Sequence, residues 1–268
     1  MGEERDHDGW IVRESGPSRP RHTVLLIPGA LATARFYDDL LAEPALKQAS
    51  IGFVAATLPG FGGTPPPDDL SMENYAAQAS KLAADLRCDV VVGHSLGANV
   101  ALEMVGSTQF SGPVVLLSPS FSRTDESKVP RALDRLSPVL GHFPYAVMMK
   151  LIGPAFKSSL PPHRRDALVA ELKKNDPRFL RAQTRHYLGY LDRHHSLVPR
   201  LCQSAVPAWV VFGQHDDIGL TESERRGLED CPAVSLVTIP DAGHFALNQQ
   251  PGQVADLLLK ATSNTPPT

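Results

Sequence analysis

Continuous apolar runs alternate with amphipathic stretches over the first 119 residues. The apolar runs show no period-2 alternation, which is typical of parallel strands buried on both faces. They predict strands within Thr23–Ala30, Ile51–Gly63, Asp89–Ser95 and Pro113–Pro119, with a short edge strand at Gly9–Arg13. Between these runs, apolar residues are spaced as in helices at Ala34–Glu43, Ser71–Leu86 and Leu96–Gly106. Strands that alternate with helices predict a mostly parallel sheet with helices on both faces.

This pattern stops at Ser120 and returns after Val206. The intervening segment has no strand signal and reads as four helical stretches broken by prolines. A strand at Pro207–Gly213, a helix at Thr221–Glu229, a strand at Val234–Pro240 and a helix at Pro251–Lys260 then complete the chain. We therefore expect an α/β fold: a core built from residues 1–119 and 207–268, with a helical lid inserted at 120–206.

Bulk composition excludes several classes of protein. The formal net charge is −3 and 42% of the residues are hydrophobic, so neither nucleic acid nor a membrane is expected as a partner. No apolar run approaches a membrane span, and the charged N-terminal segment does not resemble a secretory signal. Cys88, Cys202 and Cys231 are few and far apart, which favours reduced thiols, no metal site and a cytoplasmic location.

The insert is basic. Residues 163–200 contain nine Lys and Arg against four Asp and Glu. A solvated helix face explains such an excess, and an attraction for anionic substrates is the alternative.

The pentapeptide Gly93-His94-Ser95-Leu96-Gly97 stands between a predicted strand and a predicted helix. This is the G-x-S-x-G pattern in the context required for a nucleophile elbow. A serine in this sharp turn has a strained backbone that lifts its hydroxyl above the sheet, and glycines on both sides avoid collisions. The N-terminus of the following helix favours developing negative charge. Ser95 is therefore the candidate nucleophile.

A serine hydroxyl needs a base, and the base needs a group that orients it. Asp216 and His244 each follow the end of a predicted strand, in the order Ser, acid, His. Asp217 and Asp125 are the alternative acids.

The segments LLIPGA, LPGFGGT, VVGHSLG, VVFGQHDD and DAGHFALNQQP together resemble the lid-bearing α/β-hydrolases over nearly the whole chain. The resemblance implies Ser95 as nucleophile, Asp216 as orienting acid and His244 as general base, with no cofactor and no metal. It also implies an oxyanion hole made by the amides of Ala30 and Leu96, with Leu31 as a second candidate for the first of these. Pro28-Gly29 stands where relatives carry His-Gly, and Ala98 stands where many carry glycine.

The residues that line the substrate pocket are the hardest to predict from the sequence. We expect it to be lined by the following residues: Leu31, Phe121, Phe143, Met148, Met149, Tyr187 and Phe245. For the aromatic and Met residues of Phe143–Phe156, packing within the lid is the competing interpretation.

The expected activity is hydrolysis of a small carboxylic ester or lactone through an acyl-enzyme. Cleavage of a carbon–carbon bond, of the meta-cleavage-product type, or a lyase reaction would use the same three residues. A ligand-binding receptor on a hydrolase scaffold is the remaining alternative. A small-molecule substrate is expected in each case, and the oligomeric state is not predicted.

Overall fold

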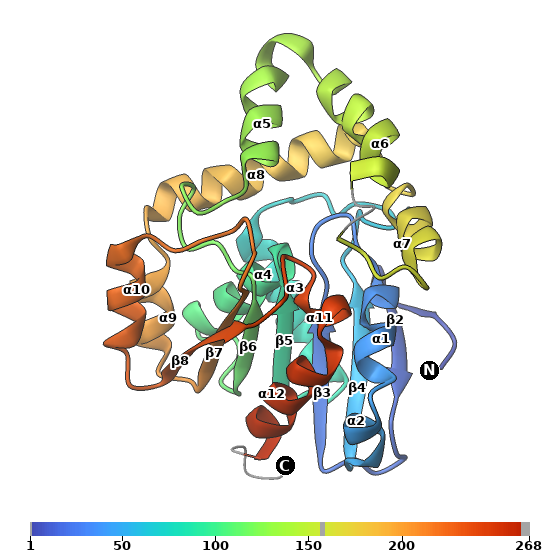
Figure 1. Ribbon diagram of the computed structural model, residues 1–268, viewed down its shortest axis with the longest axis vertical. Coiled ribbons are helices and arrows are strands. Elements are labelled where there is room, and N and C mark those ends of the chain that lie inside the picture. The colour runs from blue at the N-terminus through green and yellow to red at the C-terminus, as the bar shows by residue number, and fades with distance from the viewer. Residues whose placement is uncertain (1, 156–158, 264–268) are drawn as a thin grey trace.

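The computed structural model describes residues 2–155 and 159–263, with the backbone alone at residue 155. Eight strands form one sheet in the order β1-β2-β4-β3-β5-β6-β7-β8 (Figure 1). Their bounds are β1 Arg5–His7, β2 Trp10–Ser15, β3 His22–Ile27, β4 Ile51–Thr57, β5 Val90–His94, β6 Val114–Leu117, β7 Ala208–Gly213 and β8 Val234–Ile239. β2 pairs antiparallel with both β1 and β4, and the remaining pairs of neighbouring strands are parallel. The predicted α/β class is confirmed.

Helices cover the sheet and build the insert. Those of the core are α1 Asp38–Leu41, α2 Pro44–Gln48, α3 Met72–Asp85, α4 Leu96–Gly106, α10 Glu222–Glu229, α11 Ala246–Gln249 and α12 Pro251–Ser263, with a 3₁₀ turn at Ala34–Tyr37. Those of the insert are α5 Lys128–Leu140, α6 Phe143–Ala155, α7 Arg165–Leu172, α8 Pro177–His194 and α9 Val198–Ser204.

The apolar runs form the strands because both faces of the central sheet are covered. Every residue of β4, β5 and β6 is buried. The expected single helix at Ala34–Glu43 is instead a 3₁₀ turn followed by two short helices. Pro44 begins α2, because a proline fits the first turn of a helix and interrupts a longer one.

The insert begins after β6 and ends before β7. Its described residues form five helices rather than the expected four. In Figure 1, α8 crosses above the sheet and α5 and α6 project beyond it. Because β6 leads into the insert, the carboxyl ends of the parallel strands face it. The division of the chain at 120 and 206 stays a prediction.

A buried ion pair fastens the end of the insert to the core. The Glu103 side chain in α4 is only 1% exposed. Its carboxylate accepts hydrogen bonds from Arg200 at 2.5 and 2.8 Å and from the Tyr190 hydroxyl at 2.7 Å. These contacts join α8 and α9 to α4.

The prediction of three reduced thiols is wrong for two of them. Cys202 and Cys231 form a disulfide with their Cα atoms 5.6 Å apart, and Cys88 is a buried free thiol. The two cysteines are 29 residues apart. The packing of α9 against α10 brings the two cysteines together. Their spacing in the sequence does not predict this contact.

No helix among residues 2–155 and 159–263 has the length and apolar character needed to cross a membrane.

We predict that Arg200→Ala lowers the free energy of unfolding by about 3–5 kcal/mol, because it leaves the Glu103 carboxylate buried without its cation. Arg193→Ala is the matched control. Arg193 pairs with Glu73 in an exposed ion pair, whose loss should cost at most about 1 kcal/mol. Urea denaturation of the two variants measures the difference, and equal losses would contradict the anchoring role of Glu103.

Candidate active site

The turn between β5 and α4 leaves no space for side chains at its two glycines. A Cβ atom at Gly93 would lie 2.2 Å from the carbonyl oxygen of Gly97, and one at Gly97 would lie 2.2 Å from that of Ile27. Ser95 between them has φ 51° and ψ −119°, a conformation that a residue with a side chain rarely adopts. The sequence pattern therefore forms the strained elbow that it predicts.

The elbow lies against the loop that follows β3. A Cβ atom at Gly29 would be 3.0 Å from the Ser95 Cβ, so this loop passes directly beside the serine. The Ser95 amide donates to the Leu117 carbonyl at 2.8 Å, which fixes the elbow to β6. As the first residue of α4, Leu96 has an N–H group without an acceptor in its own helix. Ala30 is exposed and Leu31 half-buried on the adjacent loop.

Asp216 and His244 meet at the carboxyl ends of β7 and β8. The His244 Nδ1 atom lies 3.0 Å from Asp216 Oδ1. The same oxygen accepts from the Ile218 amide at 3.1 Å, and Oδ2 accepts from the Ser118 hydroxyl. The Asp216 side chain is 1% exposed and that of His244 is 22% exposed. The pair therefore stands at the edge of the sheet with one partner open to the surface.

The two partners shift each other's pKa. Burial alone would raise the pKa of Asp216, but hydrogen bonds from His244, Ser118 and Ile218 outweigh it and hold that pKa below its ordinary value. Burial would likewise lower the pKa of His244, yet the hydrogen bond and negative charge of Asp216 raise it. Asp216 is therefore an anion at neutral pH and favours the protonated imidazole.

In the described structure the alternative acids are not hydrogen-bonded to His244. Asp217 is exposed. Asp125 accepts hydrogen bonds from the amides of Phe121 and Ser122 at 3.0 and 2.8 Å. Among the described residues, Asp216 is the carboxylate that is hydrogen-bonded to His244.

His94 supports His244 through the backbone. Its Nε2 donates to the His244 carbonyl at 2.8 Å, and the two rings are 4.9 Å apart. Burial lowers the pKa of the His94 imidazole to about 3, so the ring is neutral at ordinary pH. This agrees with the expectation that His94 packs and hydrogen-bonds. No hydrogen bond between the Ser95 hydroxyl and His244 occurs in the described structure.

Asn175, which sequence reasoning missed, connects the insert to two loops of the core. Its Nδ2 donates to the carbonyls of Leu31 and Leu172 at 2.8 Å each, and its Oδ1 accepts from the Gly62 amide at 3.0 Å. Leu31 has φ 69°, and Ala32 donates to the Gly29 carbonyl across a tight turn. A leucine is unfavourable at such a position. Asn175, which is 5% exposed, therefore holds a strained turn beside Ser95.

Ser118 is a second residue that sequence reasoning missed. It immediately follows β6, and a polar residue directly after a buried strand was an available signal. Its hydroxyl engages the oxygen of Asp216 that His244 leaves free.

The residues expected to line a pocket differ in their burial. Phe121, Met149, Tyr187 and Phe245 are buried, whereas Leu31 and Met148 are half-buried. The Tyr187 hydroxyl donates to Asn99 at 3.2 Å. The expectation for Phe143 is not met, because its side chain is 64% exposed at the start of α6. An amphipathic pattern does not reveal which apolar face of a helix is covered. Phe156 lies outside the described residues.

Three candidate metal ligands coincide with the proposed acid and base. Donor atoms of Asp216, Asp217 and His244 lie within 4.8 Å of one another. However, His244 Nδ1 and Asp216 Oδ1 are already hydrogen-bonded to each other, and Ser118 engages Oδ2. The arrangement fits an oriented histidine better than a cation.

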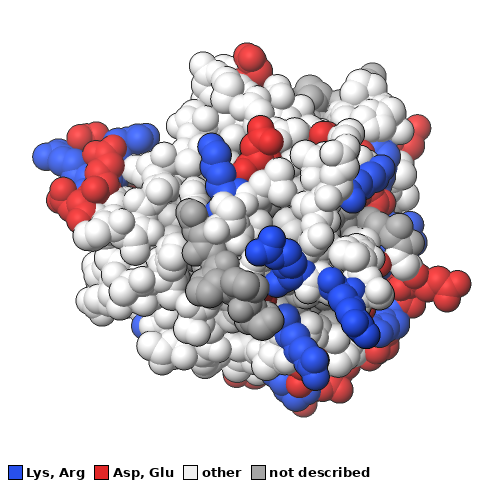
Figure 2. Space-filling view, turned by 90° about the horizontal axis from the view of Figure 1, so that it is seen from below, with Lys and Arg blue, Asp and Glu red and all other residues white. Residues whose placement is uncertain are grey.

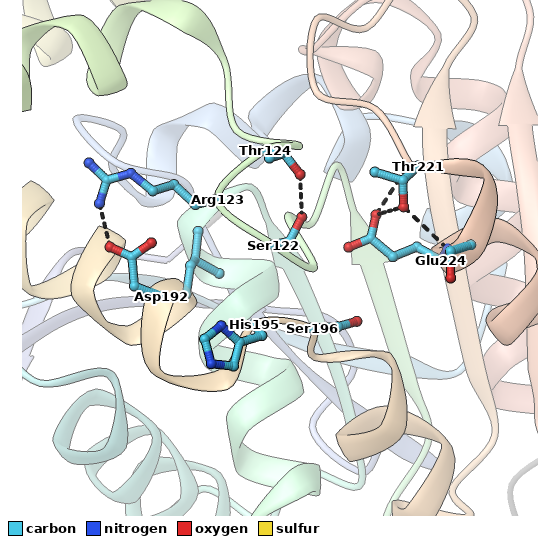
Figure 3. A pocket seen from close by; sticks show the side chains of 10 residues that line it. Ser122, Arg123, Thr124, Asp192, His195, Ser196, Thr221 and Glu224 are labelled. Carbon is cyan, nitrogen blue, oxygen red and sulfur yellow. Dashed lines mark hydrogen bonds and ion pairs between the residues drawn. The ribbon is translucent and has the colours of Figure 1, made fainter.

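A surface cavity of about 400 Å³ lies where the insert meets α10 (Figure 3). Arg123 and Asp192 form an ion pair on one side, and Thr221 and Glu224 bond on the other. Its lining residues are polar or charged except for Leu191, and they include none of Ser95, Asp216 and His244. Burial and the hydrogen-bonded carboxyl of Glu224, one of the lining residues, raise the pKa of Asp125 to about 7.

A family model described as the alpha/beta hydrolase family matches residues 24–257. The chain belongs to the alpha/beta hydrolase family and is a hydrolase-type enzyme. No match is found among curated proteins.

Solved structures share the fold at low identity. An esterase from Exiguobacterium antarcticum is 15% identical with a TM-score of 0.76, and the match covers 98% of this chain and 100% of that one. A lipase described as putative, from Acinetobacter baumannii, is 19% identical with a TM-score of 0.73, over 99% and 93% of the two chains. The N-acyl homoserine lactonase AidH, as a mutant complexed with N-hexanoyl homoserine, is 18% identical with a TM-score of 0.72, over 98% and 96% of the two chains.

We predict that the free energy of unfolding decreases as the pH rises toward and through 7, because folding raises the pKa of Asp125 from its ordinary value to about 7. The folded state holds that proton more tightly than the unfolded chain, so this contribution is complete in acid and is lost as the proton leaves. Asp125→Asn, which cannot ionise, should flatten the decrease, whereas Asp68→Asn at an exposed site should not. Urea denaturation between pH 5 and about 8.5 gives the free energy of unfolding of each variant as a function of pH. Parallel curves for wild type and Asp125→Asn would refute the assignment.

Proposed function

We propose that this protein hydrolyses a small carboxylic ester or lactone through an acyl-enzyme formed on Ser95. The observation that carries the proposal is the hydrogen-bonded Asp216–His244 pair at the same sheet edge as a serine in a strained elbow. The fold likeness to an esterase, a lipase and a lactonase supports the reaction class, although identities below 20% do not transfer a substrate.

In the proposed reaction, the Ser95 hydroxyl attacks the substrate carbonyl while its proton passes to His244 Nε2. Asp216 stabilises the imidazolium and keeps Nδ1 protonated, since Nδ1 faces its carboxylate at 3.0 Å. The amides of Leu96 and Ala30, with Leu31 as the alternative to Ala30, would donate to the oxyanion. One donor of this kind is typically worth roughly 3–4 kcal/mol of the barrier. His244 then protonates the leaving oxygen, and a water that it activates releases the acid.

Asn175 would act as a positioning residue in this scheme. The amides of Ala30 and Leu31 belong to the turn that Asn175 holds through the Leu31 carbonyl. Because Asn175 belongs to the insert, we infer that α5–α9 act as a lid that completes the site as well as covering it. No cofactor is required by these steps.

The same three residues would also serve hydrolysis of a carbon–carbon bond or a lyase reaction, and a receptor would bind without turnover. Turnover of p-nitrophenyl acetate, of a small lactone and of a dienone acid separates these reactions. A cytoplasmic location stays a prediction, and the Cys202–Cys231 disulfide is a bond more usual in oxidising compartments.

Ser95→Ala should abolish ester turnover and leave the unfolding midpoint unchanged, because the alanine removes the attacking oxygen alone. A fluorophosphonate should label wild type at Ser95 and leave the variant unlabelled, as read by peptide mass mapping. Ser107→Ala is the matched control, since that serine caps the far end of α4. Substantial turnover in Ser95→Ala, or a label on another serine, would reject the proposal.

Asp216→Asn should reduce kcat by about 10⁴, as the equivalent change does in another serine triad. The variant keeps the shape of the carboxylate but loses the charge that raises the pKa of His244. Activity requires neutral His244, so the acid limb of the pH profile should move to lower pH in this variant. The adjacent Asp217→Asn is the control and should stay close to wild type. A large loss in Asp217→Asn with a normal Asp216→Asn would reverse the assignment.

A further inference from the structure

The outer helices of the insert expose an unusual amount of apolar surface. Seven large apolar side chains are exposed in the described part of the chain, and all seven lie in α5 or α6: Val129, Leu136, Val139, Leu140, Phe143, Val147 and Leu151. Val139 is 87% exposed and Phe143 is 64% exposed. Single exposed apolar residues are ordinary, but a gathering of this kind on two neighbouring helices marks an interaction surface.

The apolar side chains form stripes along both helices. Val129, Leu136 and Leu140 share one face of α5, and Phe143, Val147 and Leu151 repeat every four residues along α6. The two helices pack against each other and against α8. In Figure 1 they form the apex of the molecule, beyond the sheet and farthest from α2 and α12. Nothing else in the described chain covers this apex.

The charges beside the stripes are almost all positive. Lys128, Arg135 and Lys150 are exposed. The acidic residue of these two helices, Asp134, is bonded to Arg123 at 2.7 Å and its side chain is 18% exposed. Across residues 120–206 there are 15 Lys and Arg against seven Asp and Glu, a formal charge of +8 in a chain of −3. The opposite end of the molecule carries both positively and negatively charged side chains (Figure 2).

We propose that the apolar faces of α5 and α6 dock on an anionic lipid surface. Helices that present apolar stripes flanked by Lys and Arg lie in the interface of such a surface, with the apolar side chains below the headgroups and the cations among them. A second copy of the chain fits less well, because a two-fold contact would place these cations against their own equivalents. Docking in the interface needs no membrane-spanning helix, so it is compatible with the absence of one among the described residues.

This proposal replaces the expectation of no membrane partner. That expectation rested on the net charge of the whole chain, which hides an insert of opposite sign. It is independent of the proposed ester hydrolysis, because none of the seven apolar residues belongs to the elbow or to the Asp216–His244 pair.

Vesicle co-sedimentation of the full chain tests the proposal. Vesicles of phosphatidylcholine alone are compared with vesicles of equal parts phosphatidylcholine and phosphatidylglycerol, at low and high salt. We expect sedimentation with the anionic vesicles that weakens at high salt. Val139→Ser with Phe143→Ser should weaken binding about tenfold or more, and so should Arg135→Glu with Lys150→Glu.

Lys47→Glu with Lys260→Glu makes the same charge change at exposed sites in α2 and α12, and it should bind as wild type does. All substituted side chains are exposed, so unchanged melting curves are expected and identify any misfolded variant. Failure to sediment with anionic vesicles, or equal binding of all variants, would overturn the proposal. A dimer in sedimentation equilibrium that Val139→Ser with Phe143→Ser dissolves, without vesicle binding, would assign the surface to a second copy instead.

Discussion

The arrangement of the site depends on a steric constraint at two glycines. At Gly93 and Gly97 a single added carbon would lie 2.2 Å from a backbone oxygen. This close approach lets α4 begin immediately at the end of β5 and places the loop after β3 beside Ser95. The strained serine, the free N–H groups at the start of α4 and the adjacent turn at Leu31 are therefore parts of one packing arrangement. A change at either glycine would displace all three.

The three residues that the sequence proposes for the reaction share a simple property. Ser95, Asp216 and His244 each follow a strand of the parallel sheet, and the carboxyl ends of parallel strands meet at one edge. Local patterns are sufficient to find such residues, because the apolar run locates the strand and the next polar residue locates the edge. The doubly buried strands were also predictable, since they lack alternation.

The features that the sequence did not reveal depend on contacts between distant segments. Asn175 meets Leu31 across 144 residues, and Ser118 meets Asp216 across 98. The Cys202–Cys231 disulfide follows from helix packing that the spacing of the cysteines does not express. Phe143 shows the same limit in the insert: it was expected in the pocket wall or in the packing of the lid, but its side chain is 64% exposed. Whether an apolar stripe is covered depends on its neighbours in space.

The position of Asn175 has a consequence for how such enzymes can diversify. The asparagine is encoded in the insert, yet the backbone that it restrains belongs to the core. An insert exchanged with that of a relative could remove the amide that keeps Leu31 in its left-handed conformation. Recombination at the boundaries of the insert therefore also changes the geometry of the core. Only donor inserts that carry an equivalent amide at the turn between α7 and α8 would be interchangeable modules.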